Sequence, residues 1–229
     1  MRPILSMVLL GVALLLAGSA RAAESALDLL DAPVGYTAAF TVSSDKGTFH
    51  GRVWHLPGRE RREWETSGGG QAVIVRRDTD AAYLLKPSGK WYVGLGLRAV
   101  AALAGGLDGM QVERRRLRDE TVAGQRATRW KTTASGPKGR FDGDVWTTPK
   151  GIVVKAAGTV TQPGGAPAPV EMTLSDVEVE AIDTTLFDPP KGWFGMDLRQ
   201  VPPDKIEQAV ESLKPLLEGR AGGGTARHP

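Results

Sequence analysis

The stretch YTAAFTV at residues 36–42 decides the fold, because successive side chains of an extended backbone point to opposite faces. One face would carry Tyr36, Ala38, Phe40 and Val42, and the other Thr37, Ala39 and Thr41. This period-two alternation is typical of a half-buried strand in an antiparallel sheet. Residues 43–47 then supply a turn. We therefore expect a β-sheet to begin at residue 36.

Alternating segments continue along the chain and are joined by turn residues. Ten more strands are predicted at residues 48–56, 59–66, 71–77, 81–86, 91–93, 112–121, 125–133, 140–147, 152–160 and 170–182. Links such as Pro57-Gly58 and the glycine-rich residues 67–70 are too short for a parallel crossover, which needs a dozen or more residues. The fold class predicted is mainly β (α+β), a curved antiparallel sheet of about 10–11 strands with short helices.

Local features predict where the sheet bends and where it is covered. In the last strand the apolar positions change parity near Ser175 and Asp176, which predicts a β-bulge. Short apolar helices are predicted at residues 25–30, ahead of the first strand, and at residues 97–103. These helices are candidates for lids over the concave face.

A further helix is predicted beyond the sheet. Asp204 and Glu207 form a capping box, in which each side chain accepts a hydrogen bond from an exposed backbone N–H. The apolar stripe consists of Ile206, Ala209, Val210, Leu213, Leu216 and Leu217. We expect the stripe to dock on its own sheet rather than on a membrane or a partner. Residues 196–218 would be a C-terminal helical extension and residues 219–229 a disordered tail.

The first residues predict export. Arg2 precedes an apolar run at residues 4–18, and small residues near Ala22 offer a cleavage site. The run is shorter than the roughly 20 residues that span a bilayer. We therefore expect residues 1–22 to be a cleaved signal peptide, residues 23–195 to form the β domain, and the mature protein to be a periplasmic monomer.

Composition excludes several function classes. The chain has no cysteine, so it has no disulfide, thiolate metal site or thiol nucleophile. Arg2 and Arg21 would leave with the signal, so 27 of the 29 basic residues would remain beside 26 acidic ones. Arginines gather at residues 59–62, 76–77 and 114–118, but acidic residues lie among them. No one-signed stripe for nucleic acid is predicted.

Candidates for chemistry are weak. His50 and His55 would point to opposite faces of one strand and cannot share a metal, so we expect a surface role for each and no metal site. Asp142 and Asp144 share a face and could serve as an acid and base pair, but solvated strand carboxylates are commoner. Residues 94–99 match a relaxed dinucleotide fingerprint, but no β-α-β unit follows. No enzyme and no cofactor are predicted.

Bulky apolar side chains are in excess on the predicted sheet. Those assigned to a ligand cavity are Phe40, Trp54, Trp64, Ile74, Tyr83, Leu85, Trp91, Trp130, Val145, Met172 and Leu174, and Trp146 belongs to the same excess. Taken singly, each is a core residue. Together, on a sheet that must curl under short helices, they suit an apolar half-barrel with a lid.

Several motifs resemble the periplasmic lipoprotein carriers of the LolA type. They are GYTAAF at 35–40, GRVW at 51–54, RREW at 61–64, RRD at 76–78, YLLKP at 83–87, WY at 91–92, GDVW at 143–146 and LFDPPKG at 186–192. The resemblance implies an unclosed β-barrel of eleven strands with helices over a hydrophobic cavity, no catalysis and no cofactor. It also implies an arginine in the third strand that holds the lid backbone, matched by Arg62, or by Arg61 after a one-residue slip.

Two functions follow as expectations. The first is non-enzymatic binding of a lipid, an acyl chain or a lipidated protein in the periplasm. The alternative is an envelope interaction or sensor protein with a solid core, which docks an envelope protein or a membrane surface through its C-terminal helix. A hydrolase based on Asp142 and Asp144 ranks below both.

Overall fold

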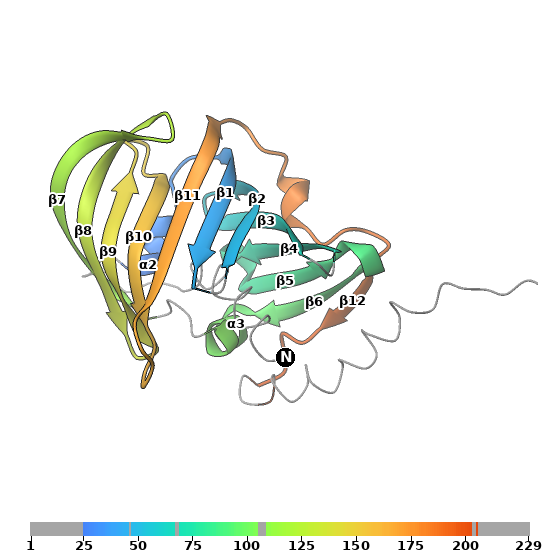
Figure 1. Ribbon diagram of the computed structural model, residues 1–229. Helices are drawn as coiled ribbons and strands as arrows, with labels where there is room; N and C mark the ends of the chain where they lie inside the picture. Colours follow the sequence, from blue (N-terminus) through green and yellow to red (C-terminus); the bar gives the residue numbers. More distant parts are fainter. Residues whose placement is uncertain (1–24, 46, 67–68, 105–108, 203–204, 206–229) are drawn as a thin grey trace, which may run out of the picture.

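The computed structural model describes residues 25–45, 47–66, 69–104, 109–202 and 205. One sheet of twelve strands runs in the order β12-β6-β5-β4-β3-β2-β1-β11-β10-β9-β8-β7, and it does not close into a barrel (Figure 1). The strands are β1 (Tyr36–Ser44), β2 (Gly47–Leu56), β3 (Arg59–Thr66), β4 (Gly69–Arg76), β5 (Ala81–Lys86), β6 (Trp91–Gly96), β7 (Gln111–Val122), β8 (Gln125–Gly136), β9 (Gly139–Thr147), β10 (Val153–Thr161), β11 (Ala168–Val179) and β12 (Phe194–Asp197). The predicted unclosed antiparallel half-barrel is confirmed.

Among the described residues, helices are few and short. They are α2 (Ala26–Leu30), α3 (Leu97–Ala104) and the 3₁₀ turns η2 (Arg77–Thr79), η3 (Pro87–Gly89) and η4 (Thr184–Phe187). Ser25 caps α2 by accepting a hydrogen bond from the Asp28 N–H. Both predicted apolar helices are therefore present.

Strand β12 is an addition to the prediction. It pairs in parallel with β6, Phe194 lying opposite Trp91, so the sheet reaches two residues past the boundary expected at residue 195. All other neighbouring strands pair antiparallel, as predicted.

The curvature of the sheet has identifiable causes. The β1–β11 register shifts between Thr37 and Ala39, opposite the predicted bulge, and Asp176 adopts a positive φ of 51° there. Gly143 and Gly158 lie opposite each other on β9 and β10, and a Cβ on either would overlap the backbone of the neighbouring strand. Only glycine allows the two strands to approach so closely.

The concave face of the sheet carries the largest apolar cluster. Figure 1 shows the sheet curling around α2, and the cluster joins Leu27 of α2 and Val100 of α3 to strand residues such as Val53, Val73 and Leu95. We call it the concave cluster. Its central side chains are fully buried, because two short helices cover the middle of the sheet.

The outer face of strands β3 to β6 is covered separately. Residues 180–193 cross it, and Phe187 of η4 is completely buried against Ala72, Ile74 and Leu85. Arg61 donates a hydrogen bond from Nη1 to the Leu186 carbonyl at 3.0 Å. We call this second set the outer cluster. This part of the sheet is thus covered on both sides.

Three predictions fall outside the described residues: the signal peptide at residues 1–22, the C-terminal helix and the tail at 219–229. Within the part of the chain that the structure describes, no helix has the length and apolar character needed to cross a membrane.

Candidate functional site

A buried polar group lies on the concave face beside the end of α2. Strand pairing sets His55 opposite Tyr36 on one side and opposite Glu60 on the other. His55 and Glu60 are 1% and 3% exposed, and the Tyr36 ring stacks on the imidazole with ring centroids 4.9 Å apart. Burial raises the pKa of the Tyr36 hydroxyl, which therefore stays neutral.

Glu60 is held as a charged group inside the protein. Burial acts to raise the pKa of its carboxyl, but the charge of Arg62 and the nearby His55 outweigh it, so the pKa lies below its usual value. Arg62 Nε donates to Glu60 Oε1, and His55 Nδ1 lies 3.4 Å from Oε2. The Arg62 guanidinium lies 5.6 Å from the centroid of the Phe40 ring. Since breaking a buried pair leaves an uncompensated charge, these groups stabilise one arrangement.

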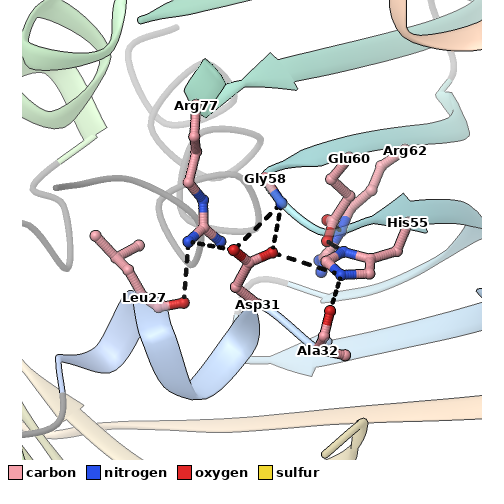
Figure 2. Close-up of polar contacts among 8 residues, drawn as sticks. All are labelled: Leu27, Asp31, Ala32, His55, Gly58, Glu60, Arg62 and Arg77. Atoms are coloured by element: carbon pink, nitrogen blue, oxygen red, sulfur yellow. Dashed lines mark hydrogen bonds and ion pairs between the residues drawn. The ribbon is translucent and has the colours of Figure 1, made fainter. Parts of the chain in front are cut away.

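The same group fastens helix α2 to the sheet (Figure 2). Arg77 donates from Nη1 to the Leu27 carbonyl at 3.3 Å and lies 3.2 Å from Asp31 Oδ2. Asp31 accepts a hydrogen bond from the Gly58 N–H at 2.9 Å. We call the side chains of Asp31, His55, Glu60, Arg62 and Arg77 together the latch.

His55 contributes a further link to the segment that follows α2. Its Nε2 lies 2.9 Å from the Ala32 carbonyl oxygen and 3.5 Å from Asp31 Oδ1. Because a carbonyl only accepts, His55 carries a proton on Nε2 in this contact. The latch therefore holds residues 27–32 against the sheet through polar contacts.

The structure separates the predicted cavity residues into two groups. Those on the concave face, in or against the concave cluster, are Phe40, Trp64, Trp91, Val145, Met172 and Leu174. Those in or against the outer cluster are Trp54, Ile74, Tyr83 and Leu85. The expectation that all of them face one cavity is therefore corrected, because strand β4 is buried on both faces and alternation there does not identify the inner one.

Trp130 and Trp146 lie on opposite faces. Trp130 pairs with Val145 across β8 and β9, so it belongs to the concave face. Its indole N–H donates to Thr147 Oγ1 at 2.8 Å. Trp146, next to Val145 on β9, points to the other face, where its indole N–H donates to Glu120 Oε1, and its buried ring is joined to the same apolar cluster.

The latch contains residues that the sequence prediction missed. His55 is buried, so its expected surface role is corrected, whereas His50 is exposed on the opposite face, 3.0 Å from the Thr41 hydroxyl. The contacts of Arg77 and His55 tie the α2 segment to the sheet. Arg61 lies on the outer face, where it donates to the Leu186 carbonyl and does not contact α2. The lid-holding role of Arg62 stays a prediction. A polar residue at an inward strand position, as His55 is, was the available signal.

Asp142 and Asp144 share the outer face of β9, as predicted. Arg140, on the same strand, donates to Asp142 from Nε and Nη2, and Arg129 donates to Asp144 from the neighbouring strand β8. The hydrogen bond from Arg140 lowers the pKa of the Asp142 carboxyl, the direction opposite to that of a general acid. Both carboxylates are engaged in ion pairs on the sheet surface, and the pair across β8 and β9 is of a kind that stabilises a sheet.

Comparison with known proteins identifies the fold of this chain through solved structures and not through its sequence. The sequence matches no protein-family model, and no curated protein is significantly similar to it. An uncharacterized conserved protein from Thermus thermophilus matches with a TM-score of 0.50 and 12% identity, over 75% of this chain and 96% of that one. At that identity the likeness shows the fold alone: the protein belongs to the class of unclosed, helix-covered β-barrels.

The other matches include the family that the sequence resembles. A LolA superfamily protein from Nitrosomonas europaea matches at 12% identity and a TM-score of 0.38, over 74% of this chain and 98% of that one. MucB matches at 13% identity and a TM-score of 0.48, over 76% of this chain and 62% of MucB. MucB has also been solved in the Pseudomonas aeruginosa MucA/MucB complex.

Proposed function

We propose that this chain is a non-enzymatic periplasmic protein that binds a lipid, an acyl chain or a lipidated protein on the concave face of its half-barrel, as a monomer. The observation that carries this proposal is the way α2 covers that face. A helix of five residues lies over the concave cluster, and polar contacts fasten it, from the Ala26 N–H to the Met110 carbonyl and from Arg77 to the Leu27 carbonyl. Such a cover can open with loss of the single bridge between Ser25 and Gln111, while the twelve strands stay paired with one another.

The chemistry of the concave face suits an apolar ligand. Phe40, Trp64, Trp91, Val145, Met172, Leu174 and Trp130 would line the ligand site, and Arg62 would help to hold the lid. A ligand that buries about ten methylenes gains about 8 kcal/mol at ~0.8 kcal/mol each, before the costs of opening the lid and ordering the chain. A dissociation constant of about 1 µM is therefore the tightest that this gain allows for such a ligand.

Native mass spectrometry of the mature protein purified from a bacterial periplasm, with lipid extraction of any adduct, tests the proposal. We expect a copurifying lipid, or uptake of an acyl chain by the purified protein. A mass that stays free of adduct after incubation with phospholipid and acyl chains would contradict lipid binding. The measured N-terminus also tests cleavage near Ala22.

A variant pair isolates the lid. Arg77→Met removes the contacts to the Leu27 carbonyl and Asp31, so it should speed uptake of a fluorescent acyl chain several-fold. Arg76→Met is the matched control, because Arg76 pairs with Asp78 and Asp188 instead. Equal uptake rates in the two variants would contradict the proposal that α2 acts as the lid.

One observation favours the alternative, an envelope interaction or sensor protein. Val53, Val73, Leu95 and Val100 are already at most 1% exposed, so the middle of the concave face is filled by the protein itself. A partner, either an envelope protein or a membrane surface, would then dock on the predicted helix at residues 204–217. Strong protection of that helix from hydrogen exchange in the isolated protein would argue against this alternative.

A further inference from the structure

The concave face extends beyond the part that α2 covers. Val112 on β7 is buried against Ala26 of α2 and Met110. Arg114 and Arg116 follow at the next two positions of the same face, and both are exposed. Along β7 the concave face therefore changes from apolar, where Ala26 of α2 covers Val112, to basic at Arg114 and Arg116.

Arg114 is positioned by an aromatic ring. Its guanidinium carbon lies 4.6 Å from the centroid of the Trp130 ring, a distance at which a cation is attracted to an aromatic face. Trp130 is itself fixed, by its hydrogen bond to Thr147 and by pairing with Val145 of the concave cluster. A cationic group and an apolar surface are thus in direct contact at this point.

Arginine side chains gather at this margin of the concave face. Arg116 donates to Asp119 Oδ1 at 2.7 Å, and Thr128 donates to the same oxygen at 2.7 Å. Arg126 has the same parity on β8 as Trp130 and is exposed. Three arginines therefore share this face, and the exposed pair of Arg116 and Asp119 is weak in water.

The position is also accessible from one side. Strand β7 ends the sheet, so no strand lies beyond it among the residues that the structure describes. Figure 1 shows β7 at one margin of the half-barrel, with the concave face turned toward α2. An amphiphile could place its chain on the apolar surface and its headgroup at this margin.

We propose that Arg114 and Arg116 bind the phosphate of an anionic amphiphile whose acyl chain lies on the concave face. This inference rests on the proposed function and names its ligand class. The planar guanidinium matches two phosphate oxygens at once, and a ring that holds it in place lowers the entropy lost on binding. The phosphate gains its charge partners at the point where the apolar surface begins.

The test compares two amphiphiles with the same chain, dodecyl phosphate and dodecyl maltoside, by titration calorimetry below their micelle concentrations. Wild-type protein should bind dodecyl phosphate about tenfold more tightly, as charged hydrogen bonds would give. The double variant Arg114→Gln/Arg116→Gln should lose this preference and still bind the maltoside. Its control is Arg115→Gln/Arg118→Gln, which removes the same charge from the same strand on the opposite face.

Each outcome decides the matter. Equal affinity of wild-type protein for both amphiphiles would overturn the headgroup site and leave the proposed lipid binding intact. Equal loss in the two double variants would reduce the effect to general charge and overturn the site. Binding of inorganic phosphate alone, with the same dependence on Arg114 and Arg116, would assign them to free phosphate instead. Failure of both amphiphiles to bind would overturn the proposed function and this inference together.

Discussion

The two halves of the sheet are built differently. From β2 to β6 both faces are covered, by the concave cluster with its helices and by the outer cluster under residues 180–193. From β7 to β10 the outer face carries ion pairs such as Arg129 with Asp144, and the concave face is only partly covered. We infer that the first half supplies most of the stability and that the second, which we call the open half, supplies less.

The largest expected effect breaks the doubly covered half. Phe187→Ala removes a ring that is fully buried in the outer cluster, so unfolding should be easier by about 3–5 kcal/mol. Urea denaturation measures this change. Phe194→Ala, at an exposed ring on β12, is the control and should cost under about 0.5 kcal/mol. A similar small loss for Phe187→Ala would show that the outer cover is not part of the folding unit.

The latch should give the next largest effect. Glu60→Gln removes one of two opposite charges that are buried in contact, which costs about 3 kcal/mol. Glu63→Gln is the matched control, since Glu63 pairs with Arg61 on the outer side and is 42% exposed. Equal losses in the two variants would contradict the special role of the buried pair.

The latch also predicts a pH dependence. The pKa of Glu60 in the folded protein lies below its ordinary value of 4.5, so its contribution is present above pH 4.5 and is lost as the pH falls through the lower folded pKa. Wild-type stability should therefore fall more steeply below pH 4.5 than that of Glu60→Gln. Parallel profiles from urea titrations at several pH values would contradict this assignment.

The close approach of β9 and β10 in the open half predicts a smaller effect on stability. Gly143→Ala places a Cβ against the Ala157 carbonyl oxygen, so β9 and β10 must separate at a cost of about 1–3 kcal/mol. Gly165→Ala, in the loop after β10, meets only ordinary contacts and is the control. If both variants were equally stable, the glycine pair would not be what sets the bend.

The sequence predicted the sheet well because its strands are local patterns. Period-two alternation and short turns located eleven strands, and the change of parity at Ser175-Asp176 located the bulge. Strand β12 was missed because its four residues pair with β6, about a hundred positions earlier, and no local pattern encodes that pairing.

The candidate site was predicted less completely, for two physical reasons. Ala72 to Val75 are all buried, so alternation does not say whether Ile74 faces the concave cluster or the outer cluster. The latch joins Asp31, His55 and Arg77 from separate elements, and their partnership appears only after folding. The apolar surface could be read from the pattern of strand residues, but the polar contacts that fasten its cover could not.

The smallest expected effect sharpens the contrast between the halves. Arg140 and Asp142 form an ion pair along β9 on the outer face of the open half, and their side chains are 53% and 43% exposed. Although the hydrogen bond from Arg140 lowers the pKa of Asp142, water and salt screen an exposed pair. Asp142→Asn should therefore leave the urea midpoint unchanged, at low salt and at high salt alike. A clear loss at low salt would make this surface pair a support of the fold, and the open half would then share the stabilising role that we assign to the covered one.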